Sequence, residues 1–151
     1  MITAAAAAML LFTAAQAPDE QWRVAALGGD APNRTVFFVD AARVERSGDR
    51  VRFWTQTIME SPPEPGAFDR SVILREGDCL AMSSAMLDSF FYANGRLIEQ
   101  DSDRGESAVH PADSMMAGVM EAVCGSSDYS SEPIDDPESV TRDAFRQIPK
   151  G

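Results

Sequence analysis

Two cysteines constrain the fold of this chain more than any other feature of its sequence. Cys79 and Cys124 lie far apart, and neither belongs to a CxxC or Cys/His pattern of the kind that binds metals. In an oxidising compartment such a pair is most simply one disulfide, and closing a loop of this length contributes roughly 4 kcal/mol of stability. Two buried free thiols are the alternative. A catalytic or metal-binding cysteine is disfavoured because no partner ligand lies nearby in sequence.

The first residues indicate the compartment. Residues 4–17 are small or apolar, no charged residue precedes Asp19, and the stretch ends in Ala-x-Ala. This pattern is typical of a secretory signal peptide, which we assign to residues 1–17, with cleavage after Ala15 or Ala17. A disordered or helical cytosolic N-terminus is the alternative. Because no cysteine near the cleavage region can carry a lipid, we expect a protein of the periplasm or a secreted one, without a stable membrane anchor.

The charge balance excludes one class of partner. The 151 residues include 24 Asp and Glu against 13 Lys and Arg, which gives a formal net charge of −11. Because such an acidic protein repels phosphate backbones, we expect no binding to nucleic acid. Hydrophobic residues make up 44%, which is enough for a packed core. No apolar run reaches the roughly 18 residues that a membrane-spanning helix needs.

The central part of the chain predicts a series of strands separated by turns. Residues 35–39 are β-branched and aromatic, residues 51–59 alternate in polarity, and residues 71–74 resume a strand pattern. Asn94 and Gly95 both tolerate positive φ and stand between strand-prone segments, which is the strongest local hairpin signal in the chain.

One amphipathic helix is predicted just before the second cysteine. Asp113 or Ser114 can cap its start, it runs to about Cys124, and Gly125 suits the position after its last turn. A single such helix needs a sheet face to cover. We therefore predict an α+β fold, in which an antiparallel β-sheet carries a C-terminal α-helix packed on one face and tethered by a disulfide from Cys79.

These elements divide the chain into three parts. A signal peptide occupies residues 1–17, an α+β domain residues 18–125, and a C-terminal tail residues 126–151. The tail is rich in Ser, Asp, Glu and Pro, so we expect it to be acidic and mostly flexible. Residues 137–147 could form a short helix, which would be marginal on its own because isolated helices of that length are barely stable in water.

None of the chemically reactive residues forms a recognisable site. His110 is the only histidine and has no neighbouring Cys or carboxylate pair. Asp101, Asp103 and Glu106 crowd one loop but lack the remaining ligands of a calcium loop, so a solvated acidic loop is the favoured interpretation. The serines at 83–84 lack the Gly-x-Ser-x-Gly context of a nucleophile, and no acid or histidine partner can be named. We predict no catalytic, cofactor-binding or metal site.

Several short motifs follow one another in an order that points to a family. They are a strand led by Trp22, Val-Phe-Phe-Val-Asp at 36–40, Ala-Ala-Arg-Val-Glu-Arg-Ser-Gly at 41–48, Val-Arg-Phe-Trp at 51–54, Asp-Cys at 78–79, Phe-Tyr-x-x-Gly at 91–95, Pro-Ala-Asp-Ser at 111–114 and Glu-Ala-Val-Cys at 121–124. Together with the two cysteines, this order resembles the surface-adhesin protein E family of small bacterial envelope proteins over about residues 22–125. The resemblance implies an antiparallel sheet with a C-terminal helix fixed against it by the disulfide. It also implies adhesion to host surfaces and haem binding, which are not transferred because no receptor-binding motif is identifiable here.

Two functions follow as hypotheses. The first is a non-enzymatic domain that binds a protein or another envelope component, because free sheet edges allow strand addition. The alternative is a binder of a small molecule or haem, in a pocket between helix and sheet lined by methionine and aromatic side chains. The eight methionines and the two tryptophans are otherwise expected in the core.

Overall fold

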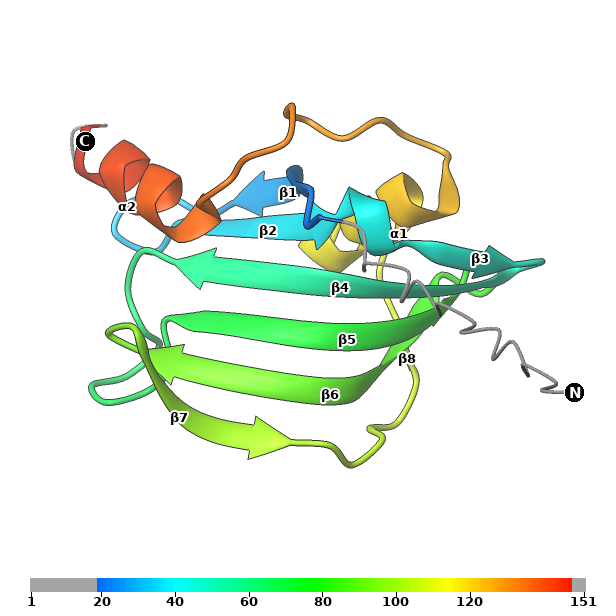
Figure 1. The fold of residues 1–151 in the computed structure, drawn as a ribbon, viewed down its shortest axis with the longest axis horizontal. Helices are drawn as coiled ribbons and strands as arrows, with labels where there is room; N and C mark the ends of the chain where they lie inside the picture. The colour runs from blue at the N-terminus through cyan, green and yellow to red at the C-terminus, as the bar shows by residue number, and fades with distance from the viewer. Residues whose placement is uncertain (1–18, 148–151) are drawn as a thin grey trace, which may run out of the picture.

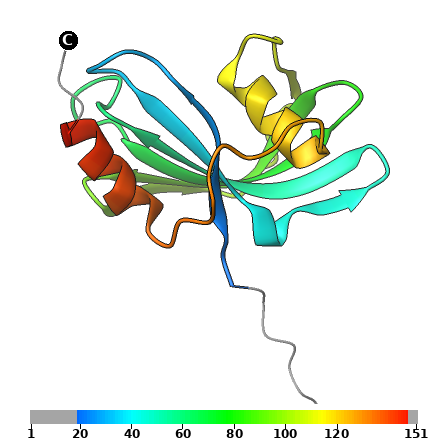
Figure 2. The ribbon, with the colours of Figure 1, turned by 90° about the horizontal axis from the view of Figure 1, so that it is seen from above.

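The computed structural model describes residues 19–147, which form one curled antiparallel sheet with a helix on each face (Figures 1 and 2). The predicted signal peptide lies outside these residues. The strands are β1 (Trp22–Gly28), β2 (Thr35–Asp40), β3 (Glu45–Ser47), β4 (Arg50–Met59), β5 (Arg70–Asp78), β6 (Ser83–Ala93), β7 (Arg96–Asp101) and β8 (Ala108–Val109). The helices are α1 (Met115–Cys124) and α2 (Pro137–Gln147), and a short 3₁₀ turn, η1, spans Ala41–Arg43.

The sheet is a meander whose order is β1-β2-β4-β5-β6-β7, with β3 paired to β4 and β8 paired to β6. Two of its connections, β3 to β4 and β6 to β7, are two-residue turns, which antiparallel neighbours allow. Asn94 and Gly95 take φ values of 51° and 76° between β6 and β7, as the predicted hairpin requires. In the turn from β3 to β4, positive φ is taken by Gly48 alone, at 59°.

Both faces of the sheet carry a core because neighbouring strand residues point to opposite sides. On one face, buried residues of β2 and β4 pack against α1. These residues are Val39, Val51 and Phe53 with Val119, Met120 and Val123. On the other face, Trp22, Phe38 and Ile58 form a second buried cluster, against which Ile134 and Phe145 pack. Figure 2 shows α1 and α2 on opposite sides of the strands.

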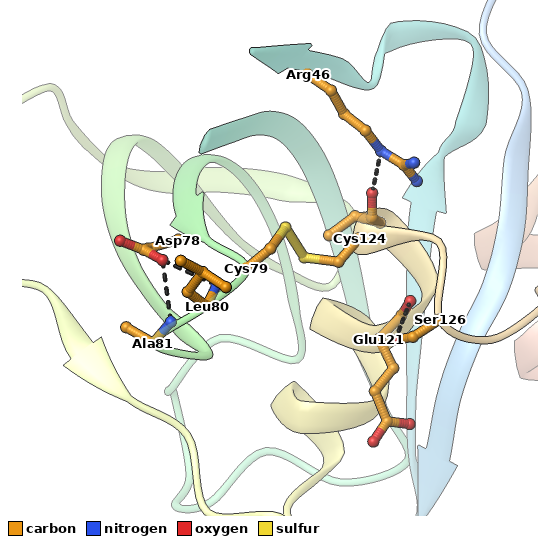
Figure 3. The surroundings of a disulfide bond; sticks show 9 residues. Arg46, Asp78, Cys79, Leu80, Ala81, Glu121, Cys124 and Ser126 are labelled. Atoms are coloured by element: carbon orange, nitrogen blue, oxygen red, sulfur yellow. Dashed lines mark hydrogen bonds between the residues drawn. A yellow bond between two sulfur atoms is a disulfide. The ribbon is translucent and has the colours of Figure 1, made fainter. Parts of the chain in front are cut away.

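The helix α1 is capped and bonded as its sequence predicts. The Ser114 side chain accepts a hydrogen bond from the Ala117 amide, and Gly125 takes the left-handed conformation after the last turn. The Cys79–Cys124 disulfide joins the end of α1 to the residue that follows β5, with the Cα atoms 5.7 Å apart (Figure 3). The predicted α+β fold, with its tethered helix, is confirmed.

Close packing of α1 on the sheet requires a glycine in β5. A Cβ atom at Gly77 would lie 2.7 Å from the Met120 Cε atom and 3.0 Å from the Val51 Cγ1 atom. Met120 and Val51 are themselves almost fully buried, so the Met120 methyl group and the Val51 side chain would have to shift within a packed core. A side chain at this position would therefore overpack the contact between the helix and the sheet.

The C-terminal segment differs from its prediction. We expected a mostly flexible tail over residues 126–151, yet residues 126–147 lie along β1 and over the second face of the sheet. The helix anticipated at 137–147 is α2. It is held by Arg142, which donates to the Met59 carbonyl and pairs with Asp69 at 3.0 Å. Arginine contacts to the sheet thus replace the large apolar surface that the segment lacks.

Neither helix of residues 19–147 has the length and apolar character of a membrane span.

Candidate binding surfaces

The two edges of the sheet differ in what pairs with them. Strand β7 lies at one edge and pairs, within residues 19–147, with β6 alone. All six of its residues are exposed, and its two apolar side chains, Leu97 and Ile98, are 46% and 43% exposed. Backbone donors and acceptors along the outer side of such a strand are available to another extended chain.

The opposite edge is covered by the protein's own chain. The Ser130 amide donates to the Val24 carbonyl and the Ile134 amide to the Trp22 carbonyl, both at 2.7 Å. The Val24 amide in turn donates to the Ser131 hydroxyl at 2.9 Å. These bonds use the outer side of β1 from Trp22 to Val24, so strand addition along that part of the edge is blocked. In Figure 1 the orange segment that leads to α2 passes over β1.

The chain around β7 is acidic and solvated. Glu99 and Asp101 belong to the strand, and Asp103 and Glu106 follow in the loop, where all four side chains are exposed. The Asp101 carboxylate accepts a hydrogen bond from the Asp103 amide, which makes a local turn. Residues 19–147 contain no group of three or more His, Cys, Asp or Glu side chains arranged to hold a metal ion. The loop therefore contributes negative charge beside the open edge.

A cavity of about 280 Å³ lies between α2 and the strands β1 and β2. Its walls are apolar except for Arg34, two threonines and the backbone of two glycines. The lining residues are Val24, Leu27, Gly28, Gly29, Arg34, Thr35, Val36, Phe38, Ile134, Val140, Thr141, Ala144 and Phe145. Leu27 and Val140, 69% and 50% exposed, mark its rim.

One cation contributes to the wall of this cavity. The Arg34 Nε and Nη2 atoms donate to the two Glu60 carboxylate oxygens at 2.7 Å, and Nη2 also donates to the Phe145 carbonyl. The hydrogen bond to Glu60 raises the pKa of Arg34 above its ordinary value. The guanidinium lies 5.0 Å from the centre of the Phe145 ring. Arg34 thus links the sheet to α2 while its charge is balanced by Glu60.

The structure brings together two residues that the sequence analysis considered separately. The Ser84 hydroxyl and the His110 Nε2 atom are 2.7 Å apart. Burial, and next the positive charge of Arg75, lower the pKa of His110, and burial also lowers the pKa of Arg75 to about 10. Ser84 is only 3% exposed, and no carboxylate bonded to His110 is recorded within residues 19–147. The pair has the serine–histidine contact of a nucleophilic site, but the serine is not accessible to a substrate and no acid among these residues orients the histidine.

Methionine and tryptophan side chains serve mainly as core. Met120 is fully buried, Met116 packs beside it, and Trp22 is 5% exposed. Trp54 is half-buried, 6.4 Å from Phe90 between ring centres. The cavity lies under α2 and not under the methionine-rich α1. Its lining includes no His, Cys, Met or Tyr, which are the side chains that ligate haem iron.

Comparison with protein families gives one match. The model of a family described as "Surface-adhesin protein E" matches residues 24–125. No curated protein and no solved structure matches the chain. The matched segment contains α1, both cysteines, β7 and the Ser84–His110 pair, but not α2.

Proposed function

Since this chain belongs to the surface-adhesin protein E family, we propose that it is a non-enzymatic binding protein of the periplasm or the exterior, which captures an extended segment of a partner protein on β7. The family supports a surface-adhesin type of binding role. The apolar residues at 4–17 and the Cys79–Cys124 disulfide support a site of action in an oxidising compartment.

The unequal edges of the sheet carry this proposal. Among residues 19–147, the outer side of β7 pairs with no other strand, whereas the start of β1 is covered by residues 130–134. An extended peptide that adds to an edge gains main-chain hydrogen bonds, and its alternate side chains meet those of the edge strand. Leu97 and Ile98 provide apolar contacts at the place where such a peptide would lie.

Charge selects the kind of segment. Glu99, Asp101, Asp103 and Glu106 place four exposed carboxylates along and just beyond β7. Arg104 forms an ion pair with Glu76 at 2.8 Å, which offsets part of its own positive charge. A partner segment that alternates basic and apolar residues would complement this edge, and like-charged acidic segments would be repelled.

Peptide selection followed by edge-blocking tests the binding proposal. A displayed peptide library is selected on the oxidised protein, and the selected peptides are measured against Glu99→Pro and Gln100→Pro. Because successive strand amides point to opposite sides, one of these prolines removes an outward amide and the other removes an amide that bonds to β6. Amide hydrogen exchange of the wild type distinguishes the two positions, because the outward amide exchanges faster than the amide that bonds to β6.

We expect the outward proline to abolish binding with little loss of melting temperature. We also expect Glu99→Lys to weaken basic peptides at least tenfold, while the control Asp135→Lys, an exposed acid beside the covered edge, leaves them unchanged. Peptides that bind the outward-proline variant as tightly as wild type would refute capture on β7.

The compartment is tested separately. Expression of the full chain in a bacterium followed by fractionation should place it outside the cytoplasm, with a mass that corresponds to cleavage after Ala15 or Ala17. A full-length, reduced protein in the cytoplasm would contradict the proposal.

A further inference from the structure

The cavity beneath α2 is a second site that peptide capture on β7 does not use. Its walls come from β1, β2, residue Ile134 and α2, at the opposite edge of the sheet from β7. Four lining residues, Val140, Thr141, Ala144 and Phe145, lie in α2, beyond the segment that matches the family model.

The size of the cavity limits what it can hold. A volume of about 280 Å³ is slightly below the usual range for ligand pockets, which begins near 300 Å³. An apolar cavity of about 150 Å³ accommodates benzene, so on that scale this cavity takes about eleven carbon atoms. This excludes large ring systems and suits one hydrocarbon chain of medium length.

The walls are held in place by contacts that involve no ligand. Arg142 binds the Met59 carbonyl and Asp69, and Arg70 pairs with Glu138 at 3.1 Å. On the other side of α2, the Arg34 guanidinium donates to the Phe145 carbonyl at 2.7 Å. Because α2 is anchored on both sides, the cavity is already formed, and a ligand need not order it.

Arg34 supplies the polar contact. Its side chain is 14% exposed, and its Nη1 atom is buried with no hydrogen-bond partner among residues 19–147. A buried N–H without a partner is costly, so a ligand oxygen that accepts from it is favoured. A ligand carboxylate at this place would be repelled by the Glu60 carboxylate, which lies against the same guanidinium. The acceptor that fits is therefore neutral.

We propose that this cavity binds an uncharged hydrocarbon group of about eight to eleven carbons that carries one carbonyl oxygen, as in a ketone or an acyl ester. The chain lies among Val24, Val36 and Phe38, and the oxygen accepts a hydrogen bond from Arg34.

Calorimetric titration with straight-chain 2-alkanones tests this. Each added methylene should raise affinity about fourfold, and the increase should level off near eleven carbons. Octanoate should bind at least tenfold more weakly than 2-octanone. Affinity that is independent of chain length, or a preference for octanoate, would overturn the proposal.

Variants locate the site. Ala144→Trp, on the cavity wall, should abolish binding of 2-nonanone, while Gln147→Trp, on the same helix but outside the lining, should bind it like wild type. Arg34→Lys keeps a positive charge near Glu60 and removes Nη1, and should weaken 2-nonanone about fivefold. Binding that persists in Ala144→Trp would place the ketone elsewhere and overturn the assignment. If Arg34→Lys releases α2, seen as fast amide exchange, the wild-type chain-length series still decides.

Discussion

Removal of the Arg142 side chain should reveal how strongly α2 is held to the sheet. Arg142 donates to the carbonyl oxygens of Met59 and Asp69, and its guanidinium lies 3.0 Å from the Asp69 carboxylate. Both side chains are mostly buried, at 22% and 16% exposed. A hydrogen bond from a charged donor contributes about 1.5–3 kcal/mol. Arg142→Ala also leaves the Asp69 charge without its partner. After allowance for partial exposure, we expect a loss of about 2–4 kcal/mol.

A matched control lies one turn further along the same helix. Among residues 19–147, Arg146 forms an ion pair only with Asp143 of α2, and these side chains are 72% and 53% exposed. Exposed pairs of this kind contribute little, so Arg146→Ala should change stability by less than about 0.5 kcal/mol. Urea unfolding followed by circular dichroism measures both variants, and amide exchange in α2 reports whether the helix is released. Equal effects of the two substitutions would refute the inference that Arg142 anchors α2.

Three further predictions concern the disulfide, the helix contact and pH. Cys79→Ser and Cys124→Ser should each lower stability by roughly 4 kcal/mol, because the unfolded chain regains the entropy of a loop whose ends are 45 residues apart. A wild-type melting temperature that is unaffected by reductant would contradict this. Gly77→Ala should lower stability by about 1–3 kcal/mol through overpacking. Gly118→Ala, whose Cβ atom would lie 3.5 Å from its nearest neighbour, should raise stability by about 0.5–1 kcal/mol through helix propensity. If urea unfolding finds Gly77→Ala more stable than Gly118→Ala, the contact between helix and sheet is misassigned. The pKa of His110 is lower in the folded than in the unfolded protein, so its contribution to stability is complete above pH about 6.5 and is lost as the pH falls towards the folded pKa. His110→Gln should therefore reduce the dependence of stability on pH in this range, as measured by denaturant titration.

Local rules explain why much of the fold was predictable. Asn94 and Gly95 take the positive φ angles that make a two-residue hairpin, and Ser114 and Gly125 bound α1 through their own side-chain and backbone preferences. Each signal depends on a few neighbouring residues. The Cys79–Cys124 bond was predictable for a different reason, since two cysteines in an oxidising compartment have a single intramolecular pairing.

The packing of residues 126–147 was not predictable from composition. Ser, Asp, Glu and Pro indicate weak hydrophobic collapse, yet Arg142 finds carbonyl groups at the ends of β4 and β5 that are distant in sequence. The spacing of Val140, Thr141, Ala144 and Phe145 on one face of α2 was a signal for docking. This pattern covers only about two turns of helix, so without the facing strands it did not outweigh a composition that favours a flexible tail.

The candidate sites, like the fold, could be predicted from the sequence only in part. Strand addition at a sheet edge was an expectation from fold class, but which edge is open depends on where residues 130–134 lie. The contact of Ser84 with His110 arises because β8 pairs with β6 and brings the following residue close, and no sequence spacing encodes that. The cavity under α2 depends on the docking of α2, so it was missed for the same reason.

A sheet with two open edges can add copies without limit, as fibrils do. Here the chain folds back over the start of its own first strand, so that part of the edge is covered before any second molecule arrives. Two copies that meet through β7 would cover each other's open edge by twofold symmetry, and the outer strand sides left within residues 19–147 are short, for example β3 and the end of β1. Such short segments offer few backbone hydrogen bonds, which disfavours growth of the sheet beyond a pair.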